Sequence, residues 1–181
     1  IEGKHRLAGS LDPQARAARE PVPASRRREH RIEREYLAIV EGDLSRPGTF
    51  AQNLARDNRS LRRSVARNPR EGRRAVTHYE VRERLGSATL VSVRLETGRT
   101  HQIRIHFAET GHPVLGDRVY RPRRFSPPPL EAPRQMLHAR LLGFADPSTG
   151  KPVEAASALP EDFREVLARL RRLERNKKKP R

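Results

Sequence analysis

The sequence of 181 residues predicts an α+β fold, with a mixed, largely antiparallel sheet and a few short helices. Several short runs alternate apolar and polar residues, which is typical of half-buried strands. Glycines lie in the short turns that join neighbouring runs. Two other stretches repeat apolar residues three and four apart, which is the spacing of a helix face. The length suffices for one domain with its own core.

Four segments show the strand alternation, and they are residues 34–42, 75–81, 89–95 and 136–144. In the third segment Val91, Val93 and Leu95 fall on one face, as alternate residues of a strand do. Gly86 lies in the turn before this segment, and residues 146–150 form a turn after the last one. These runs predict a meander of neighbouring strands.

Two helices are predicted. The first runs from about His101 to Glu109, with Thr100 placed to cap its start and Gly111 just past its end. Ile103 and Phe107 lie four residues apart on its buried side. The second opens at residue 160 and carries one apolar stripe. The stripe consists of Phe163, Val166, Leu167, Leu170 and Leu173. Such a stripe predicts docking against the sheet.

The charge balance predicts a polyanionic partner. The chain has 39 Lys+Arg against 22 Asp+Glu, for a net charge of +17. RNA, DNA or an anionic membrane would each satisfy this charge by counterion release. No apolar run is long enough to cross a bilayer. The absence of cysteine excludes disulfides and Cys-ligated zinc, and fits a reducing compartment.

Residues 43–74 are polar and strongly basic. A dense cationic run within this stretch consists of Arg59, Arg62, Arg63, Arg67, Arg70, Arg73 and Arg74. One interpretation is a solvated loop with a hairpin near residues 69–72. The other is a phosphate-contacting surface, which positions RNA without reading its sequence. We favour the second, because so many cations repel one another unless an anion is present.

A further group of cations follows the strand that ends at Leu95. Arg99, His101 and Arg104 crowd the strand exit and the helix start. Free backbone N–H groups and cations can together hold a phosphate there, or a carboxylate that must stay ionised. His138 lies in the last strand with no second ligand at metal spacing, so we interpret it as a structural histidine.

The region around these cations resembles the signature of the RluA-type pseudouridine synthases, which isomerise uridine to pseudouridine in structured RNA. The resembling residues are TGRTHQIRIH at 97–106, then Gly111, His112, Pro113, Gly116, Asp117 and Tyr120. His5-Arg6-Leu7, the YLA block at Tyr36 and the LHA block at His138 are similar to further family motifs. The resemblance implies a pseudouridine synthase-like catalytic domain that lacks its first strands, with no metal and no cofactor.

The resemblance also implies roles for individual residues. Tyr36 matches the tyrosine that lies against the target base and is a candidate for the proton-removing base. Arg104 matches the arginine that pairs with the catalytic carboxylate. Arg6 matches the residue whose side chain fills the gap left by a flipped uridine. For RNA binding we expect Arg6 together with Arg62, Arg63, Arg99 and His101.

The catalytic aspartate of the family has no counterpart at its expected position, where Ala8 stands. Asp12 is the nearest acid, but a misplacement of about 1 Å can cost roughly 100-fold in rate. We therefore expect a recognisable synthase domain with little or no activity. A non-catalytic RNA-binding protein on the same scaffold is the alternative. A ribosome-associated basic protein is a third reading, but it leaves the two signature blocks unexplained.

Three regions are expected along the chain: an irregular basic segment at 1–30, the synthase-like domain at 31–173 and a basic tail at 174–181. Residues 8–30 are rich in Ala, Arg and Pro, and cannot bury enough apolar surface to offset their ordering entropy. Family-like sequence stops at Leu7 and resumes near Arg31, so this segment is either a flexible arm or an out-of-frame stretch. The resemblance also predicts about fifty earlier residues, and hence a truncated product or a partial gene.

The expected partner is ribosomal RNA or tRNA, with no DNA and no membrane. We expect a monomer in the cytoplasm.

Overall fold

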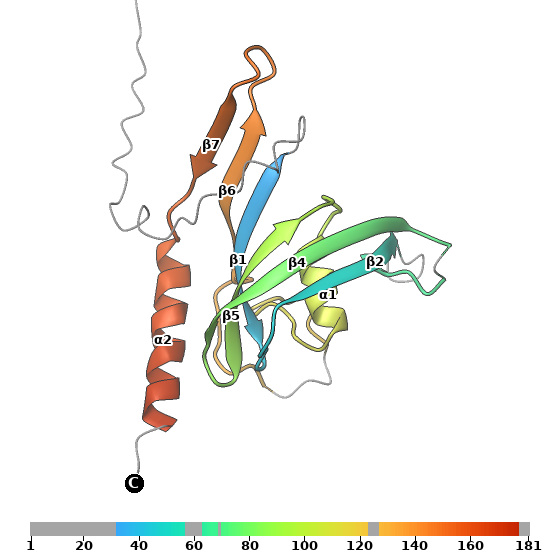
Figure 1. Ribbon diagram of the computed structural model, residues 1–181. Coiled ribbons are helices and arrows are strands. Elements are labelled where there is room, and N and C mark those ends of the chain that lie inside the picture. Colours follow the sequence, from blue (N-terminus) through green and yellow to red (C-terminus); the bar gives the residue numbers. More distant parts are fainter. Residues whose placement is uncertain (1–31, 57–62, 69, 123–126, 178–181) are drawn as a thin grey trace, which may run out of the picture.

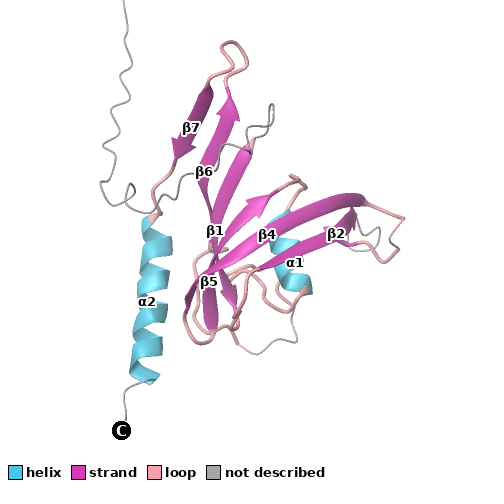
Figure 2. Cartoon of the chain, viewed as in Figure 1, coloured by secondary structure: helices cyan, strands magenta, loops and turns pink. Residues whose placement is uncertain are grey.

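The computed structural model of the chain describes residues 32–56, 63–68, 70–122 and 127–177 (Figure 1). Within these ranges seven strands form one sheet, in the order β3-β2-β4-β5-β1-β6-β7, and every pair is antiparallel (Figure 2). The strands are β1 (Glu33–Glu41), β2 (Gly48–Arg56), β3 (Arg63–Val65), β4 (Arg73–Arg84), β5 (Ala88–Leu95), β6 (Leu137–Ala145) and β7 (Pro152–Ala156). The α+β class and all four expected strands are confirmed.

The two helices, α1 (Gln102–Glu109) and α2 (Glu161–Lys177), pack on opposite faces of the sheet (Figure 1). Strand β1 shows the division, because its side chains alternate between the faces. Ala38 and Val40 belong to the buried cluster that contains Phe107 of α1. Leu37 and Ile39 belong to the cluster beneath α2. No helix in the described ranges combines the length and the apolar character that a membrane span requires.

Helix α2 docks on the sheet as its apolar stripe predicts, but over a shorter distance. Phe163, Val166, Leu167 and Leu170 are buried, whereas Leu173 is 44% exposed. The helix outlasts the part of the sheet that it covers, so its last apolar residue has nothing to pack against. Residues 174–177 of the expected basic tail are part of this helix.

Strands β2 and β3 lie within residues 43–74, where a loop was the simpler expectation. Strand β2 pairs with β4 from Gly48 opposite Tyr79 to Leu54 opposite Arg73. The expected hairpin near residues 69–72 is wrong, because β2 lies between β3 and β4 and the turn joins strands that do not pair. The polar sequence of β2 alternates weakly, and its pairing and burial against β4 decide its conformation.

Strand β7 was not expected either. All five of its residues are exposed, and it pairs with β6 alone at the edge of the sheet. Pro152 is its first residue, a position where a strand tolerates proline. A strand with no buried face leaves no alternation in the sequence by which to recognise it.

Candidate active site

The side chain of Gln102 joins the loop before α1 to the sheet. Its amide oxygen accepts hydrogen bonds from the hydroxyl of Thr97 at 2.8 Å and the backbone N–H of Arg99 at 3.0 Å. Its amide nitrogen donates to the carbonyl of Val76 and the hydroxyl of Thr77, both at 2.9 Å. Gln102 is only 2% exposed. Because the amide uses both donors and both acceptor positions, it fixes the loop and the first turn of α1 on β4.

The network continues from Thr77 to His106. The hydroxyl of Thr77 accepts from Gln102 and also forms a hydrogen bond with Nδ1 of His106, 2.9 Å away. Nε2 is buried without a hydrogen-bond partner in the described ranges. Burial lowers the pKa of His106 to about 4, so this residue is neutral at pH 7.

Arg104 is held by Asp117 in a paired, two-bond contact. Nε and Nη2 of Arg104 donate to the two carboxylate oxygens at 2.6 and 2.7 Å. The backbone N–H groups of Val119 and Tyr120 donate to Oδ1 of the same carboxylate at 2.9 and 3.0 Å. The carbon of the Arg104 guanidinium also lies 4.9 Å from the centroid of the Tyr120 ring. Asp117 thus holds one edge of the guanidinium and the Tyr120 ring covers one face.

Both members of this pair are charged at neutral pH. Burial alone would raise the pKa of Asp117, but the hydrogen bonds from Arg104, Tyr120 and Val119 outweigh it and lower that pKa below its usual range. The hydrogen bond to Asp117 raises the pKa of Arg104 despite partial burial. The contact uses Nε and Nη2, and within the described ranges Nη1 has no partner. Arg104 can therefore present Nη1 to a second anion.

His101 occupies the N-cap position of α1 in a left-handed conformation, with φ 56° and ψ 20°. The expected cap by Thr100 is wrong, because no side chain caps this helix. A left-handed backbone costs roughly 1–2 kcal/mol for a residue with a Cβ. The hydrogen bond between Nδ1 of His101 and the hydroxyl of Tyr120, at 2.8 Å, helps to hold it there.

Burial, and then the positive charges of Arg104 and Arg63, lower the pKa of His101. Arg63 of β3 thus lies close enough to this end of α1 to act on it electrostatically. Arg63 is also on the same face of the sheet as Val65 and Leu54, the face that Ile105 of α1 covers. These contacts bring two of the expected RNA-binding residues, Arg63 and His101, into one basic region around Arg104.

Tyr36 lies on the same face of the sheet as α1. It packs against the buried cluster that contains Ile103 and Phe107. In the sheet it is paired with Val93 of β5 on one side and Ala139 of β6 on the other. The structure therefore puts the expected base and the helix that carries Arg104 on one face, as a shared site requires.

The remaining expected residues differ in their placement. Nε of Arg99 donates to the carbonyl of Arg74 at 3.2 Å, so this side chain is turned toward β4. His138 is paired with Leu37 on the α2 side, with Nε2 3.3 Å from the carbonyl oxygen of Ser157. The described part of the chain includes His138. It contains no cluster of three or more histidines and acids that could hold a metal ion. The other expected residues, Arg6, Ala8, Asp12 and Arg62, lie outside the described ranges.

Sequence reasoning assigned no role to Asp117, Tyr120 or Gln102. All three lie within the two signature blocks, so their presence in the motif was the available signal. Sequence alone could not reveal that Asp117 turns back onto α1, because thirteen residues separate it from Arg104. The contact depends on the turn that follows the helix.

Comparison with known proteins agrees with this geometry. The family model for RNA pseudouridylate synthase matches residues 18–109. An uncharacterized RNA pseudouridine synthase, YlyB, of Bacillus subtilis is 43% identical over 142 residues, which are 78% of this chain and 45% of that protein. Ribosomal large subunit pseudouridine synthase D of Haemophilus influenzae is 42% identical over 154 residues, covering 78% of this chain and 46% of that protein. The chain spans less than half the length of these curated relatives.

Two solved human structures are also similar. RNA Pseudouridylate Synthase Domain Containing 1 has a TM-score of 0.59 and 25% identity, covering 78% of this chain and 66% of that one. RNA Pseudouridylate Synthase Domain Containing 4 has a TM-score of 0.61 at 24% identity over 77% of this chain and 62% of that one, and shows the fold alone. Because the family model matches half of the sequence, this chain belongs to the RNA pseudouridylate synthase family.

Proposed function

We propose that this chain acts on structured RNA, ribosomal RNA or tRNA, and isomerises uridine to pseudouridine, with activity impaired because Ala8 replaces the catalytic aspartate. Membership of the family supports the reaction. A relative named as a ribosomal large subunit pseudouridine synthase supports ribosomal RNA as one substrate. The net charge of +17 supports a polyanionic partner.

One observation carries the proposal, namely that Arg104 is locked in orientation on the face where Tyr36 packs. Asp117 neutralises one edge of the guanidinium and leaves Nη1 unused. A fixed guanidinium can keep a nearby catalytic carboxylate ionised, and hence nucleophilic. In this proposal Nη1 of Arg104 faces the catalytic carboxylate while Nε and Nη2 pair with Asp117.

The proposed reaction begins with a uridine flipped out of its RNA, with Arg6 filling the gap and phosphate contacts offsetting the unstacking energy. A carboxylate attacks C1′ of the ribose, and the bond from C1′ to N1 of uracil breaks. The uracil turns, C5 attacks C1′ and displaces the carboxylate, and Tyr36 acts as the base that removes the hydrogen from C5. No atom is gained or lost overall, because that hydrogen is exchanged for one on N1.

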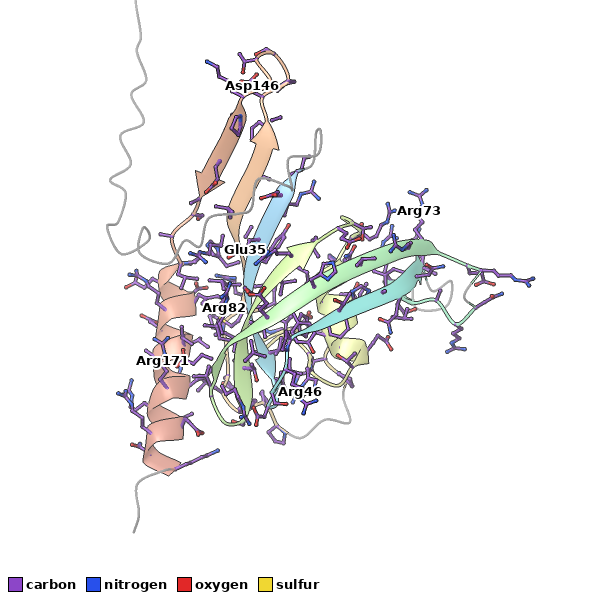
Figure 3. The ribbon with its side chains drawn as sticks, in the orientation of Figure 1. Glu35, Arg46, Arg73, Arg82, Asp146 and Arg171 are labelled. Carbon is purple, nitrogen blue, oxygen red and sulfur yellow. The ribbon has the colours of Figure 1, made fainter. Side chains whose placement is uncertain are left out.

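Basic side chains around α1 are proposed to hold the RNA by its phosphates. Arg63 and Arg73 project from the face of the sheet that α1 covers, as their pairing positions in β3 and β4 require. Figure 3 shows Arg73 toward the end of β4 that lies farther from α2, and Arg82 nearer to α2. Contacts to phosphate orient RNA without specifying its sequence. Arg62, Arg99 and His101 complete the proposed surface.

A second candidate function is favoured by Ala8, which offers no nucleophile: an RNA-binding protein that keeps the scaffold without the chemistry. Asp12 is the acid that would have to substitute. In either case we propose RNA and not DNA or a membrane as the partner, and a cytoplasmic monomer. The proposed organisation is a basic segment at 1–30, the synthase domain at 31–173 and a tail at 174–181.

Release of tritium from ribosomal RNA labelled at C5 of uridine tests the chemistry, and RNA affinity measured against salt tests the binding. We expect this chain to release tritium far more slowly than a family member that has an aspartate at the position of Ala8. We also expect its RNA affinity to weaken as salt rises. Release at an ordinary enzymatic rate would contradict the impairment. An RNA affinity that does not weaken as salt rises would contradict both candidate functions.

A further inference from the structure

Arg34 lies on β1, two residues before Tyr36 and on the same face of the strand. Alternate residues of a strand are roughly 7 Å apart, so the two side chains are neighbours. Arg34 is half-buried, and in the described ranges its guanidinium has no ion pair and no side-chain hydrogen bond. The adjacent acids, Glu33 and Glu35, alternate to the opposite face, where Glu35 pairs with Arg140 at 3.0 Å. Among the described residues, none on the Tyr36 side of β1 thus forms an ion pair with this cation.

The guanidinium of Arg34 is seated against the signature loop at Gly98. A Cβ built on Gly98 would lie 2.6 Å from Nη1 of Arg34, closer than real Cβ contacts allow. Gly98 is not among the glycines with positive φ, so its backbone conformation does not require glycine. The missing side chain instead makes room for Arg34. This holds the cation between Tyr36 and the loop that leads into Arg104.

A partly desolvated cation without a counter-ion is unfavourable unless an anion completes the site. Arginine is well suited to phosphate, which its planar guanidinium can bind through two parallel hydrogen bonds. We propose that Arg34 binds a phosphate of the RNA strand that carries the target uridine, and that Gly98 leaves the guanidinium in the position where it does so, because a methyl group there would displace it. The inference rests on the proposed function, since it concerns RNA bound beside Tyr36.

The test compares four variants of the full 181-residue chain: Arg34→Ala, Arg34→Lys, Gly98→Ala and the double variant Arg34→Ala/Gly98→Ala. Arg169→Ala is the matched control, because Arg169 is exposed on α2, which packs on the opposite face of the sheet. Binding of a fluorescein-labelled fragment of large-subunit ribosomal RNA is measured from 50 to 300 mM salt. Log K falls as log salt rises, and the loss of one phosphate contact should reduce the steepness of this fall, which is called the slope below, by about 0.7–0.9.

We expect Arg34→Ala to lower the slope by that amount, and Arg34→Lys to retain most of it. Gly98→Ala should lower the slope like Arg34→Ala, because its methyl group displaces the guanidinium. The double variant should then bind no more weakly than Arg34→Ala, since both changes remove one contact. Arg169→Ala should leave the slope unchanged. Thermal melting of each variant checks the fold, and Arg34→Gln replaces Arg34→Ala if the latter melts below the parent.

A parent chain that binds the RNA with the same slope as Arg34→Ala would overturn the role of Arg34 and leave the proposed function intact. Additive losses in the double variant would show that Gly98 does not act through Arg34. If the affinity of the parent chain does not depend on salt, both the proposed function and this inference are overturned. The parent measurement alone therefore separates failure of the proposed function from failure of the role of Arg34.

Discussion

The guanidinium of Arg104 and the carboxylate of Asp117 form two nearly parallel hydrogen bonds, 2.6 and 2.7 Å long. The Asp117 side chain is fully buried and that of Arg104 is 11% exposed. The turn after α1 brings the carboxylate back onto the helix, where two backbone N–H groups also bind it. The pair therefore connects the two signature blocks physically, and any change to Asp117 acts on Arg104.

Asp117→Asn should destabilise the fold by about 3 kcal/mol, because it leaves a mostly buried guanidinium without its counter-charge. Urea unfolding at pH 7 measures this loss. Asp43→Asn is the control, since Asp43 also pairs with an arginine, Arg84, but on the exposed surface. Its effect should be much smaller. Equal losses in the two variants would show that burial does not strengthen the contact between Arg104 and Asp117.

His106 should make stability depend on pH between about 6.5 and 4. Its pKa is about 4 in the folded chain against 6.5 ordinarily, so in this range the unfolded chain takes up a proton that the native state excludes. The contribution of His106 is therefore complete above pH 6.5 and falls by about 3 kcal/mol as the pH drops to 4. Urea unfolding at several pH values measures the fall.

His106→Asn isolates this effect, because the amide of asparagine can still form a hydrogen bond with Thr77 but does not titrate. The difference in unfolding free energy between parent and variant should shrink as the pH falls through this range. A difference that stays constant from pH 7 to pH 4 would mean that His106 is not the group responsible.

Gln102→Leu should loosen the start of α1, because it removes all four hydrogen bonds of the amide. Each buried group left unsatisfied costs about 1–3 kcal/mol. Hydrogen exchange should show reduced protection at the backbone N–H of Arg99 and along the first turn of the helix. Gln135→Leu is the control, because the side-chain amide of Gln135 makes no hydrogen bond within the described ranges. Unchanged protection in Gln102→Leu would exclude an anchoring role for the amide.

Leu170→Ala should destabilise the chain by about 2–5 kcal/mol, because Leu170 is 1% exposed beneath α2. Leu173→Ala, three residues further along the same stripe, should change stability by no more than about 0.5 kcal/mol, since Leu173 is 44% exposed. Thermal unfolding of the two variants compares them directly. Similar melting temperatures would mean that α2 does not dock in the register described.

The sequence predicted elements well wherever one face of an element is buried. Strand β5 and the stripe of α2 were recognisable because alternation and helical spacing follow directly from burial on one side. Strands β2 and β7 lacked that signal. Phe50 of β2 is held by stacking on Tyr79 at 5.1 Å and by an edge contact with Phe107 at 5.2 Å, and these partners come from other segments.

By itself the sequence determined the α+β class, the positions of the buried helix and strand faces, and the concentration of cations around residues 97–104. These depend on local spacing, which neighbouring residues specify. Only the tertiary structure decided that Asp117 holds Arg104, that Gly98 makes room for Arg34, and that His101 takes a left-handed conformation where a cap by Thr100 was expected. Each of these depends on chain segments that meet in space after folding, and no local pattern encodes such contacts.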